Sequence, residues 1–505
     1  MRETYDIVII GAGHNGLVAA LSLAQAGFSV CVVEGRDQIG GCAITTEPLI
    51  PHFRHNPHAN SFLFADILPS GIKPSDLGVK LIQPEAQFGV AFVDGRPPVI
   101  LHRPDMLAKT QASLSVYSRT DASKYVEMKR RSAKLTPILR QGLYAPADTA
   151  WFEKQREAVK QALGPFCGGN KLGRRTARQL IDSHFQTSEI RILLYALTLE
   201  TGVGLEDPGS DLAFLSFTLW VAGRWRIPVG GMQSYSDALY QAGRSAGAQL
   251  TVATPVERVL VERGRAVGVQ TSGGGFIGAS LAVVAATPVL NLFDKLLSEY
   301  EISSAEQVEL EKFRRTSLSS IGTSAFCLDW TPLYKSGVHD RQIDRCLKTI
   351  VGFETPADVL DQQASVRAGL LPSPAGTVRI QSLWDATMAP SGHHMAAVDS
   401  SFPPMAAMDR DDWRMVQAAF PTAFFETWQR YLVEDCEAPP MTMSLDDGLA
   451  FERRMLMRLG AAQYRTSVDS LYMAGPGVYP GGGMHGACGQ NAAAVIISDL
   501  LRRQS

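Results

Sequence analysis

The chain has 505 residues, of which 45% are hydrophobic and 19% are charged, and its formal net charge is -2. This composition is ordinary for a folded protein, and the length favours two domains over one. Since there is no basic excess or basic tract, nucleic acid is not an expected partner. The first predicted strand starts close to Met1 and no apolar run is long enough to cross a bilayer. We therefore expect a soluble, cytoplasmic protein without a signal peptide, and peripheral membrane contact is not indicated.

The N-terminal residues predict a strand, a glycine-rich turn and a helix. Asp6–Ile10 is a short, largely apolar run that ends at a glycine, which is typical of a buried strand in a parallel sheet. Three glycines follow in G-x-G-x-x-G spacing at Gly11, Gly13 and Gly16. They allow a tight turn and a close approach of the backbone to a pyrophosphate. A helix from about Asn15 to Gln25 would then present unpaired amides and a positive dipole end to an anion.

A second strand and an acidic residue complete this pattern. Phe28–Val33 predicts the strand, and Glu34 follows it at the offset where an acid accepts hydrogen bonds from ribose hydroxyls. The complete pattern predicts dinucleotide binding but leaves NAD and FAD open. A second G-x-G-x-x-G match, at Gly273, Gly275 and Gly278, has strand-like residues on both sides and no helix after it. We interpret this second match as a hairpin turn.

The rest of the chain changes character several times. Residues from about Leu101 to Leu219 are largely helical in pattern, and we interpret them as an inserted helical region. The α/β pattern resumes near Arg226, and residues 290–446 alternate between strand-like and helical segments. The aromatic stretch Leu215–Trp225 is interpreted as packing between two domains. The C-terminal segment predicts a strand, a glycine-rich turn and a helix that begins near Met484.

Cysteine and histidine usage argues against several kinds of site. The seven cysteines are scattered, odd in number and without a C-x-x-C pair, which disfavours a disulfide framework, a zinc knuckle and a dithiol redox centre. His52, His55 and His58 lie close together in sequence, but no carboxylate or cysteine cluster accompanies them and prolines interrupt the segment. We therefore predict no metal site.

Four segments of the chain resemble the FAD-dependent phytoene desaturase and carotenoid isomerase-like family, within the larger amine oxidase-like flavoprotein group. The matching segments are Gly11–Leu17, Val32–Gly41, Gly230–Met232 with the strand-like residues after it, and Ala474–Ala494. They cover both ends and the middle of the chain. The resemblance is weaker in the helical region and between Leu290 and Asp446, where a substrate would be selected.

The resemblance implies an α/β fold in which a Rossmann-like FAD-binding domain is assembled from discontinuous segments. We expect residues 1–80, 227–290 and 460–505 to form that domain. Residues 81–226 and 291–459 would form an α+β substrate domain with the helical insertion. The resemblance also implies an FAD-dependent dehydrogenase, desaturase or oxidase that removes a hydride from a C–H bond of a small, largely apolar or amine-containing substrate. The electron acceptor, whether oxygen, a quinone or another molecule, and the oligomeric state are not identified.

The resemblance extends to individual residues. Gly11, Gly13 and Gly16 would hold the FAD pyrophosphate, Glu34 would bind the adenosine ribose, and the backbone of Val256 would pair with the adenine edge. The C-terminal helix would stabilise negative charge on the reduced flavin. The complete predicted cofactor set is Gly11, Ala12, Gly13, Asn15, Gly16, Glu34, Gly35, Arg36, Gly40, Gly41, Cys42, Ala43, Val256, Gly475, Gly483, Met484 and His485. His485 and His58 are the candidate catalytic residues, and we expect His58 or Asn60 to line the flavin or substrate pocket.

One departure from the family pattern affects the chemistry. Many amine oxidase relatives carry a lysine on a strand that faces the flavin, and the equivalent segment here, around Cys327, lacks one. This difference puts efficient use of oxygen in doubt. Two alternatives remain open at this point: a redox-neutral, flavin-dependent isomerase, and a flavin-binding scaffold protein. A pyridine nucleotide-disulfide reductase is disfavoured, because neither a second dinucleotide motif in strand–helix context nor a redox cysteine pair is present.

Overall fold

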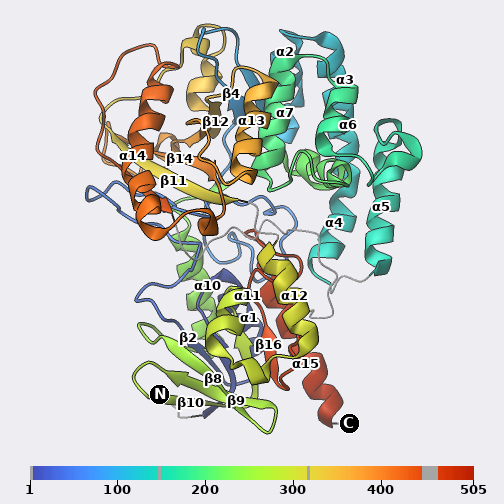
Figure 1. Ribbon diagram of the computed structural model, residues 1–505, viewed down its shortest axis with the longest axis vertical. Coiled ribbons are helices and arrows are strands. Elements are labelled where there is room, and N and C mark those ends of the chain that lie inside the picture. Colours follow the sequence, from blue (N-terminus) through green and yellow to red (C-terminus); the bar gives the residue numbers. More distant parts are fainter. Residues whose placement is uncertain (1–3, 146–148, 316–318, 446–463, 505) are drawn as a thin grey trace.

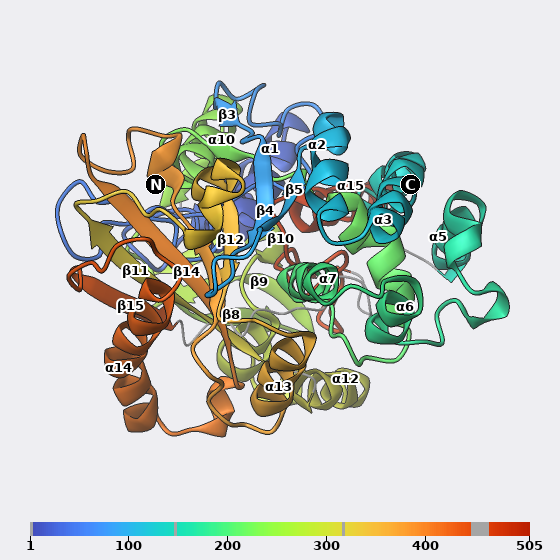
Figure 2. The same ribbon diagram turned by 90° about the horizontal axis from the view of Figure 1, so that it is seen from above.

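The computed structural model describes residues 4–145, 149–315, 319–445 and 464–504. Two seven-stranded sheets organise these residues, one above the other in the view of Figure 1. The lower sheet contains the N-terminal strand, and the C-terminal helix packs beside it. The upper sheet lies among helices α7, α13 and α14, and the same arrangement is seen from above in Figure 2. The fold is therefore mixed α/β, as predicted.

The lower sheet has the strand order β7-β2-β1-β10-β9-β8, with β16 also paired to β10. Strands β7, β2, β1, β10 and β16 are parallel, whereas β9 and β8 complete the sheet in antiparallel pairing. The bounds are β1 Thr4–Ile10, β2 Val30–Val33, β7 Gln249–Thr251, β8 Val256–Glu262, β9 Arg265–Thr271, β10 Phe276–Ala285 and β16 Leu471–Met473. The four residues of β2 are all buried, in keeping with a parallel sheet that helices cover.

The predicted hairpin at the second glycine motif is confirmed. Strands β9 and β10 pair antiparallel, with Phe276 opposite Gln270, and the connection between them contains Gly273 and Gly275. Gly274 has a φ of 72°, which is the left-handed conformation that such turns require. No helix follows this motif directly; Gly273 and Gly275 serve the turn, and Gly278 lies within β10.

Three helices pack together beside the lower sheet. They are α1 His14–Gln25, α10 Gln233–Ser245 and α15 Ala487–Gln504, and α1 contacts both of the others. A Cβ on Gly489 would lie 2.0 Å from the carbonyl oxygen of Asn15, so glycine permits the close approach of α15 to α1. The predicted start of α15 near Met484 is wrong by three residues. Gly483 and Gly486 have φ values of 127° and 63°, and this left-handed backbone delays the helix until Ala487.

The upper sheet has the order β15-β11-β14-β13-β12-β4-β5. Its pairings are antiparallel except for the parallel pair of β12 and β4. The bounds are β4 Ala86–Val90, β5 Val99–His102, β11 Ser320–Leu328, β12 Lys348–Val351, β13 Gly376–Arg379, β14 His394–Phe402 and β15 Met441–Leu445. Helix α14 packs on this sheet through aromatic side chains, with Phe402 and Phe420 in edge-to-face contact.

The segment predicted to be helical is helical in the structure. Its helices are α2 Leu107–Ser115, α3 Arg119–Ser132, α4 Thr136–Leu143, α5 Thr149–Leu163, α6 Ala177–His184, α7 Ser188–Glu200, α8 Ser210–Ala213 and α9 Leu219–Val221. The remaining helices and the short strand pair are α11 Val289–Asn291, α12 Ser304–Arg315, α13 Pro356–Arg367, α14 Arg410–Gln429, β3 Leu81–Ile82 and β6 Ile227–Pro228. Along residues 4–145, 149–315, 319–445 and 464–504, no helix is both long and apolar enough to cross a membrane.

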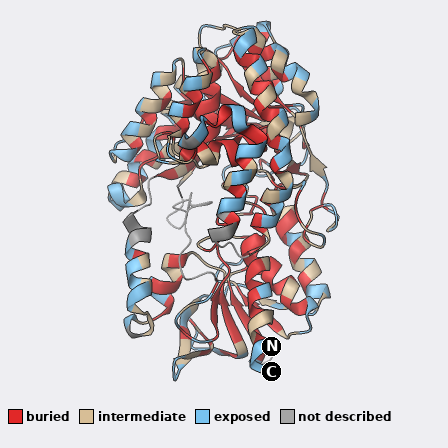
Figure 3. Ribbon diagram, turned by 90° about the vertical axis from the view of Figure 1, so that its right-hand side faces the viewer, coloured by how far each residue is buried: buried red, intermediate tan, exposed pale blue. Residues whose placement is uncertain are grey.

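The two sheets take their strands from different parts of the chain. Strands of the lower sheet come from segments within 1–80, 227–290 and 460–505, and strands of the upper sheet come from within 81–226 and 291–459. Figure 3 shows buried residues concentrated in the strands and on the inward faces of the helices. We propose that these two sets of segments correspond to the two predicted domains.

Candidate functional site

A cavity of about 610 Å³ lies where the two halves of the molecule meet, because residues from both sheets line it. Volumes of this size are typical of small-molecule sites. Twelve of the predicted cofactor and catalytic residues line the cavity: Gly11, Gly13, Asn15, Glu34, Gly35, Arg36, Gly41, Cys42, His58, Val256, Gly483 and Met484. The six others lie outside its lining: Ala12, Gly16, Gly40, Ala43, Gly475 and His485.

The first glycine motif lies at the carboxyl end of β1, at the start of α1. Gly11 has a φ of 100°, which favours glycine, and a Cβ on Gly16 would lie 2.1 Å from the carbonyl oxygen of Gly11. Gly13 differs, because the nearest atom to a Cβ there would be Gly41 Cα at 3.9 Å. Gly11 and Gly16 therefore permit the turn and its packing, whereas Gly13 leaves space open on the cavity side.

The acidic residue after β2 is held in place by the glycine motif. Glu34 accepts hydrogen bonds from the backbone N–H groups of Ala12, at 2.7 Å, and Arg36, at 2.9 Å. These bonds fix the carboxylate at the carboxyl ends of β1 and β2, where Val256 also reaches the cavity. This edge of a parallel sheet is where dinucleotides bind in such folds.

A hydrogen bond joins the N-terminal and C-terminal glycine segments, which are 469 residues apart in sequence. Nε2–H of His14 donates to the carbonyl oxygen of Gly483 at 3.1 Å, and both residues line the cavity. Burial lowers the pKa of His14 to about 4, against the smaller opposing effect of this hydrogen bond. His14 is therefore neutral at pH 7. Sequence reasoning did not select His14, although its place between Gly13 and Gly16 could have indicated it.

His485 lies behind the cavity wall. The side chain is fully buried, and its Nδ1 accepts a hydrogen bond from the backbone N–H of Ala487, the first residue of α15, at 3.0 Å. Nε2–H donates to the carbonyl oxygen of Gly482 at 3.2 Å. Burial, with a further effect of nearby His14, lowers the pKa of His485 to about 3. The neutral ring thus holds the glycine turn at the start of the helix.

The three histidines between residues 52 and 58 lie in different environments. His58 lines the cavity, His55 is buried, and His52 is exposed on a turn with a φ of 69°. In the described part of the chain, no group of three or more His, Cys, Asp or Glu side chains is arranged to hold a metal ion. All seven cysteines are free thiols.

The opposite wall of the cavity comes from the upper sheet and carries charged groups that sequence reasoning missed. Lys348 on β12 forms an ion pair with Glu200 at the end of α7, and Asp399 on β14 forms one with Arg379 on β13. Of these four residues, Lys348, Glu200 and Asp399 line the cavity. Trp225, expected to pack between domains, also lines it. Nothing in the local sequence indicates which strands pair in this sheet.

The segment expected to lack the family's lysine forms β11, and part of it lines the cavity. Cys327 lies on β11 as expected, but it belongs to a small apolar cluster with Phe53, Ala325 and Met395 and does not line the cavity. Ile321 and Thr323 are the residues of β11 that do so. A lysine is nevertheless present in the cavity wall, because Lys348 reaches it from a different strand.

The glycine-lined half of the cavity fits a dinucleotide. Asn15 Oδ1 is buried at the start of α1 and has no hydrogen-bond partner among the described residues. A buried amide oxygen without a partner is costly unless a ligand completes its bonding. Together with the space beside Gly13 and the α1 N-terminus, this atom is suited to a phosphate- and hydroxyl-bearing ligand.

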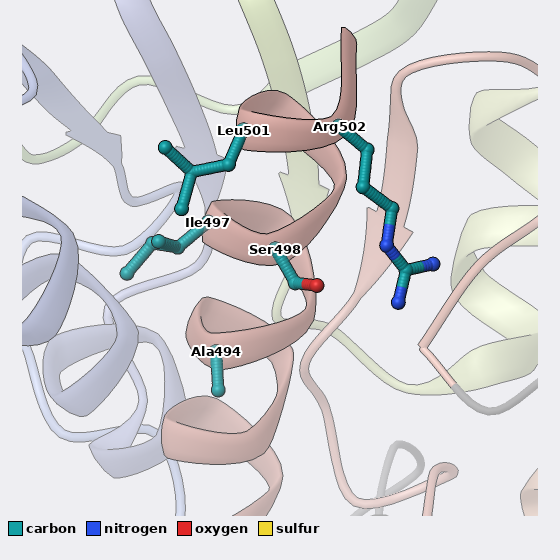
Figure 4. A pocket seen from close by; sticks show the side chains of 5 residues that line it. All are labelled: Ala494, Ile497, Ser498, Leu501 and Arg502. Carbon is teal, nitrogen blue, oxygen red and sulfur yellow. The ribbon is translucent and has the colours of Figure 1, made fainter. Parts of the chain in front are cut away.

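A second hollow lies on the surface of α15 and is separate from this cavity. Figure 4 shows its lining, which consists of Ala494, Ile497, Ser498, Leu501 and Arg502 along the C-terminal half of the helix. It contains none of the predicted site residues and none of the glycine segments. The cavity between the two halves is therefore the candidate functional site.

Comparison with known proteins identifies related sequences. Residues 9–66 match the family described as NAD(P)-binding Rossmann-like domain. Mouse pyridine nucleotide-disulfide oxidoreductase domain-containing protein 2 is 27% identical, over 99% of this chain and 94% of that protein. A limonene dehydrogenase polypeptide of Castellaniella defragrans is 26% identical, over 98% and 95%. Hydroxyneurosporene desaturase of Rhodobacter capsulatus is 25% identical, over 99% of each.

Solved structures share the fold. A Methanosarcina mazei oxidoreductase superposes with a TM-score of 0.63 at 16% identity, covering 97% of this chain and 99% of that one. Cyclohexylamine oxidase of Brevibacterium oxydans gives a TM-score of 0.55 at 16% identity, covering 99% of this chain and 100% of that one. Members of the amine oxidase-like and desaturase families depend on FAD, and the Rossmann-like domain of this chain fits that cofactor. The chain is an oxidoreductase that is similar in sequence to dehydrogenases and desaturases and shares its fold with an amine oxidase.

Proposed function

We propose that this protein is an FAD-dependent dehydrogenase, desaturase or oxidase that removes a hydride from a C–H bond of a small molecule. The observation that carries the proposal is that one cavity is bounded by both glycine segments, which the His14–Gly483 hydrogen bond joins, and by the upper sheet. Bound FAD would accept the hydride. The parts of the cavity around Gly13, Glu34 and Val256 would hold the phosphates and adenosine of FAD.

The protein's own residues would orient and shield the reactants. Met484 and Gly483 line the cavity just before α15, whose positive dipole end favours negative charge near this turn. His485 would act as a positioning residue rather than a catalytic one, because its ring bonds to backbone groups behind the wall. His58 lines the cavity and keeps its proposed place beside the substrate or cofactor. The buried walls would exclude water from the reacting carbon.

The test uses the purified holoprotein. Its visible absorption spectrum should show bound flavin, and anaerobic addition of a substrate from a panel of alkenes, alcohols and amines should bleach that absorption. Steady consumption of an electron acceptor would distinguish net oxidation from redox-neutral isomerisation, in which the substrate changes but no acceptor is consumed. Flavin that no member of the panel reduces or converts would favour the scaffold alternative and contradict the proposal.

A further inference from the structure

The two ion pairs in the cavity wall differ in how completely their hydrogen bonds are satisfied. Arg379 donates to both oxygens of Asp399, at 2.9 and 3.0 Å, and to the carbonyl oxygen of Asn56. Asp399 also accepts from Thr323 at 2.9 Å and from Asn60 at 3.2 Å. Although burial opposes ionisation, Arg379 holds the pKa of Asp399 below its ordinary value. Both carboxylate oxygens of Asp399 therefore have hydrogen-bond partners without a ligand.

The pair of Lys348 and Glu200 is less complete. The Lys348 side chain is 4% exposed, so water satisfies little of its hydrogen bonding. Its ammonium group has three N–H donors, and Glu200 is the one acceptor it reaches within the described residues. The ammonium also lies 5.6 Å from the ring centre of Trp225. Donor capacity is therefore left over on a charged group in the cavity wall.

Neighbouring side chains add further polar atoms. Thr377 donates to the second oxygen of Glu200 at 3.4 Å. The Ser400 hydroxyl also has no hydrogen-bond partner among the described residues, but it alternates with Asp399 along β14 and lies beside Val398 on the other face of the sheet. Placing the Lys348 ammonium against a hydrocarbon would leave its remaining N–H donors unsatisfied, which is unfavourable. A ligand that carries an oxygen atom would satisfy them.

We propose that Lys348 is a specificity-determining residue, which donates a hydrogen bond to an oxygen acceptor on the substrate. The acceptor is a carboxylate, carbonyl or hydroxyl oxygen, and so the substrate is an oxygen-bearing small molecule rather than a plain hydrocarbon or a simple amine. This inference rests on the proposed function, in which this half of the cavity binds the substrate. Glu200 keeps the ammonium charge compensated and holds it at the wall.

The test measures binding of four probes with one carbon skeleton: benzoate, benzyl alcohol, benzylamine and toluene. Each probe is titrated into wild-type protein and into the Lys348→Met and Lys348→Met/Glu200→Gln variants. The double variant removes both charges together, so no unpaired charge remains buried. The matched control is Lys109→Met/Glu85→Gln, because Lys109 and Glu85 form an exposed pair outside the cavity lining. Binding is followed by the shift in melting temperature and by the change in the flavin spectrum.

We expect benzoate, benzyl alcohol or both to bind the wild type, and to bind the double variant roughly tenfold more weakly or worse. Toluene should bind both proteins alike. The inference is overturned if the folded double variant binds the oxygen-bearing probes as the wild type does, or if neither of these probes binds the wild type. It is also overturned if benzylamine or toluene alone binds.

The two proposals fail in distinguishable ways. Protein that takes up no FAD but shows Lys348-dependent melting shifts would contradict the proposed function and keep this inference. Protein that binds reducible FAD but whose probe binding does not depend on Lys348 would contradict this inference and agree with the proposed function.

Discussion

Replacing Gly13 by alanine separates cofactor binding from folding. The new Cβ would have Gly41 Cα as its nearest neighbour at 3.9 Å, an ordinary contact, and the φ of Gly13 is -66°. The fold therefore accepts the methyl group, and alanine in place of glycine at the start of α1 should lower the free energy of unfolding by about 1 kcal/mol or less. The methyl group does, however, occupy space on the cavity side of the turn.

That space is where the backbone would approach the FAD pyrophosphate. A phosphate displaced by the methyl group would lose at least one hydrogen bond to a charged group, which is worth about 1.5 to 3 kcal/mol. The dissociation constant for FAD should then rise about 10-fold to 150-fold. The control is Gly273→Ala, since Gly273 belongs to the other glycine motif and a Cβ there would meet nothing within 4 Å.

The assay titrates FAD into apoprotein and follows quenching of flavin fluorescence, with melting temperature as the measure of folding. Gly273→Ala should bind FAD as the wild type does. If Gly13→Ala also binds FAD with wild-type affinity, the turn does not hold the pyrophosphate and the reasoning is refuted. If Gly13→Ala fails to fold, the contact distances have been misjudged.

Two further predictions concern buried charge. The folded-state pKa values of His14 and His485, about 4 and about 3, lie below the ordinary 6.5, so the unfolded chain binds more protons. The contribution of these two neutral histidines to the free energy of unfolding should therefore be fully present above about pH 6.5. It should fall by roughly 1.4 kcal/mol per pH unit per histidine as the pH decreases toward 4. Denaturant unfolding at several pH values checks this, and equal free energies at pH 7.5 and 5.5 would contradict it. Arg379→Met should cost about 3 to 5 kcal/mol of unfolding free energy by leaving Asp399 buried without its partner. Arg414→Met, which breaks an exposed pair, should change the free energy by about 0.5 kcal/mol or less; similar losses in both variants would count against the buried pair.

The sequence predicted the first strand–helix–strand unit of the lower sheet well because its signals are local. Strand, turn, helix and acid follow one another between β1 and Glu34, so their contacts are made by neighbours in the chain. The false motif at Gly273 was recognised by the same local logic. The start of α15 was misplaced because left-handed glycines interrupt a segment that otherwise reads as helical.

The charged wall could not be predicted, because it depends on contacts between distant segments. Lys348 and Glu200 are 148 residues apart, and Arg379 meets Asp399 through the pairing of β13 with β14. The short strands of residues 290–446 have no pattern that specifies their neighbours. His14 is an intermediate case, since its position within the glycine motif was visible but its partner Gly483 was not.

The central claim is that the two distant glycine segments bind one flavin together. Hydrogen exchange of apoprotein, measured with saturating FAD and separately with ADP, tests this claim most directly. We expect FAD to slow exchange both in residues 11–17 and in residues 482–486, whereas ADP should slow exchange in the first segment alone. If FAD protects only the N-terminal segment, as ADP does, the C-terminal segment is not part of the flavin site and the account is wrong.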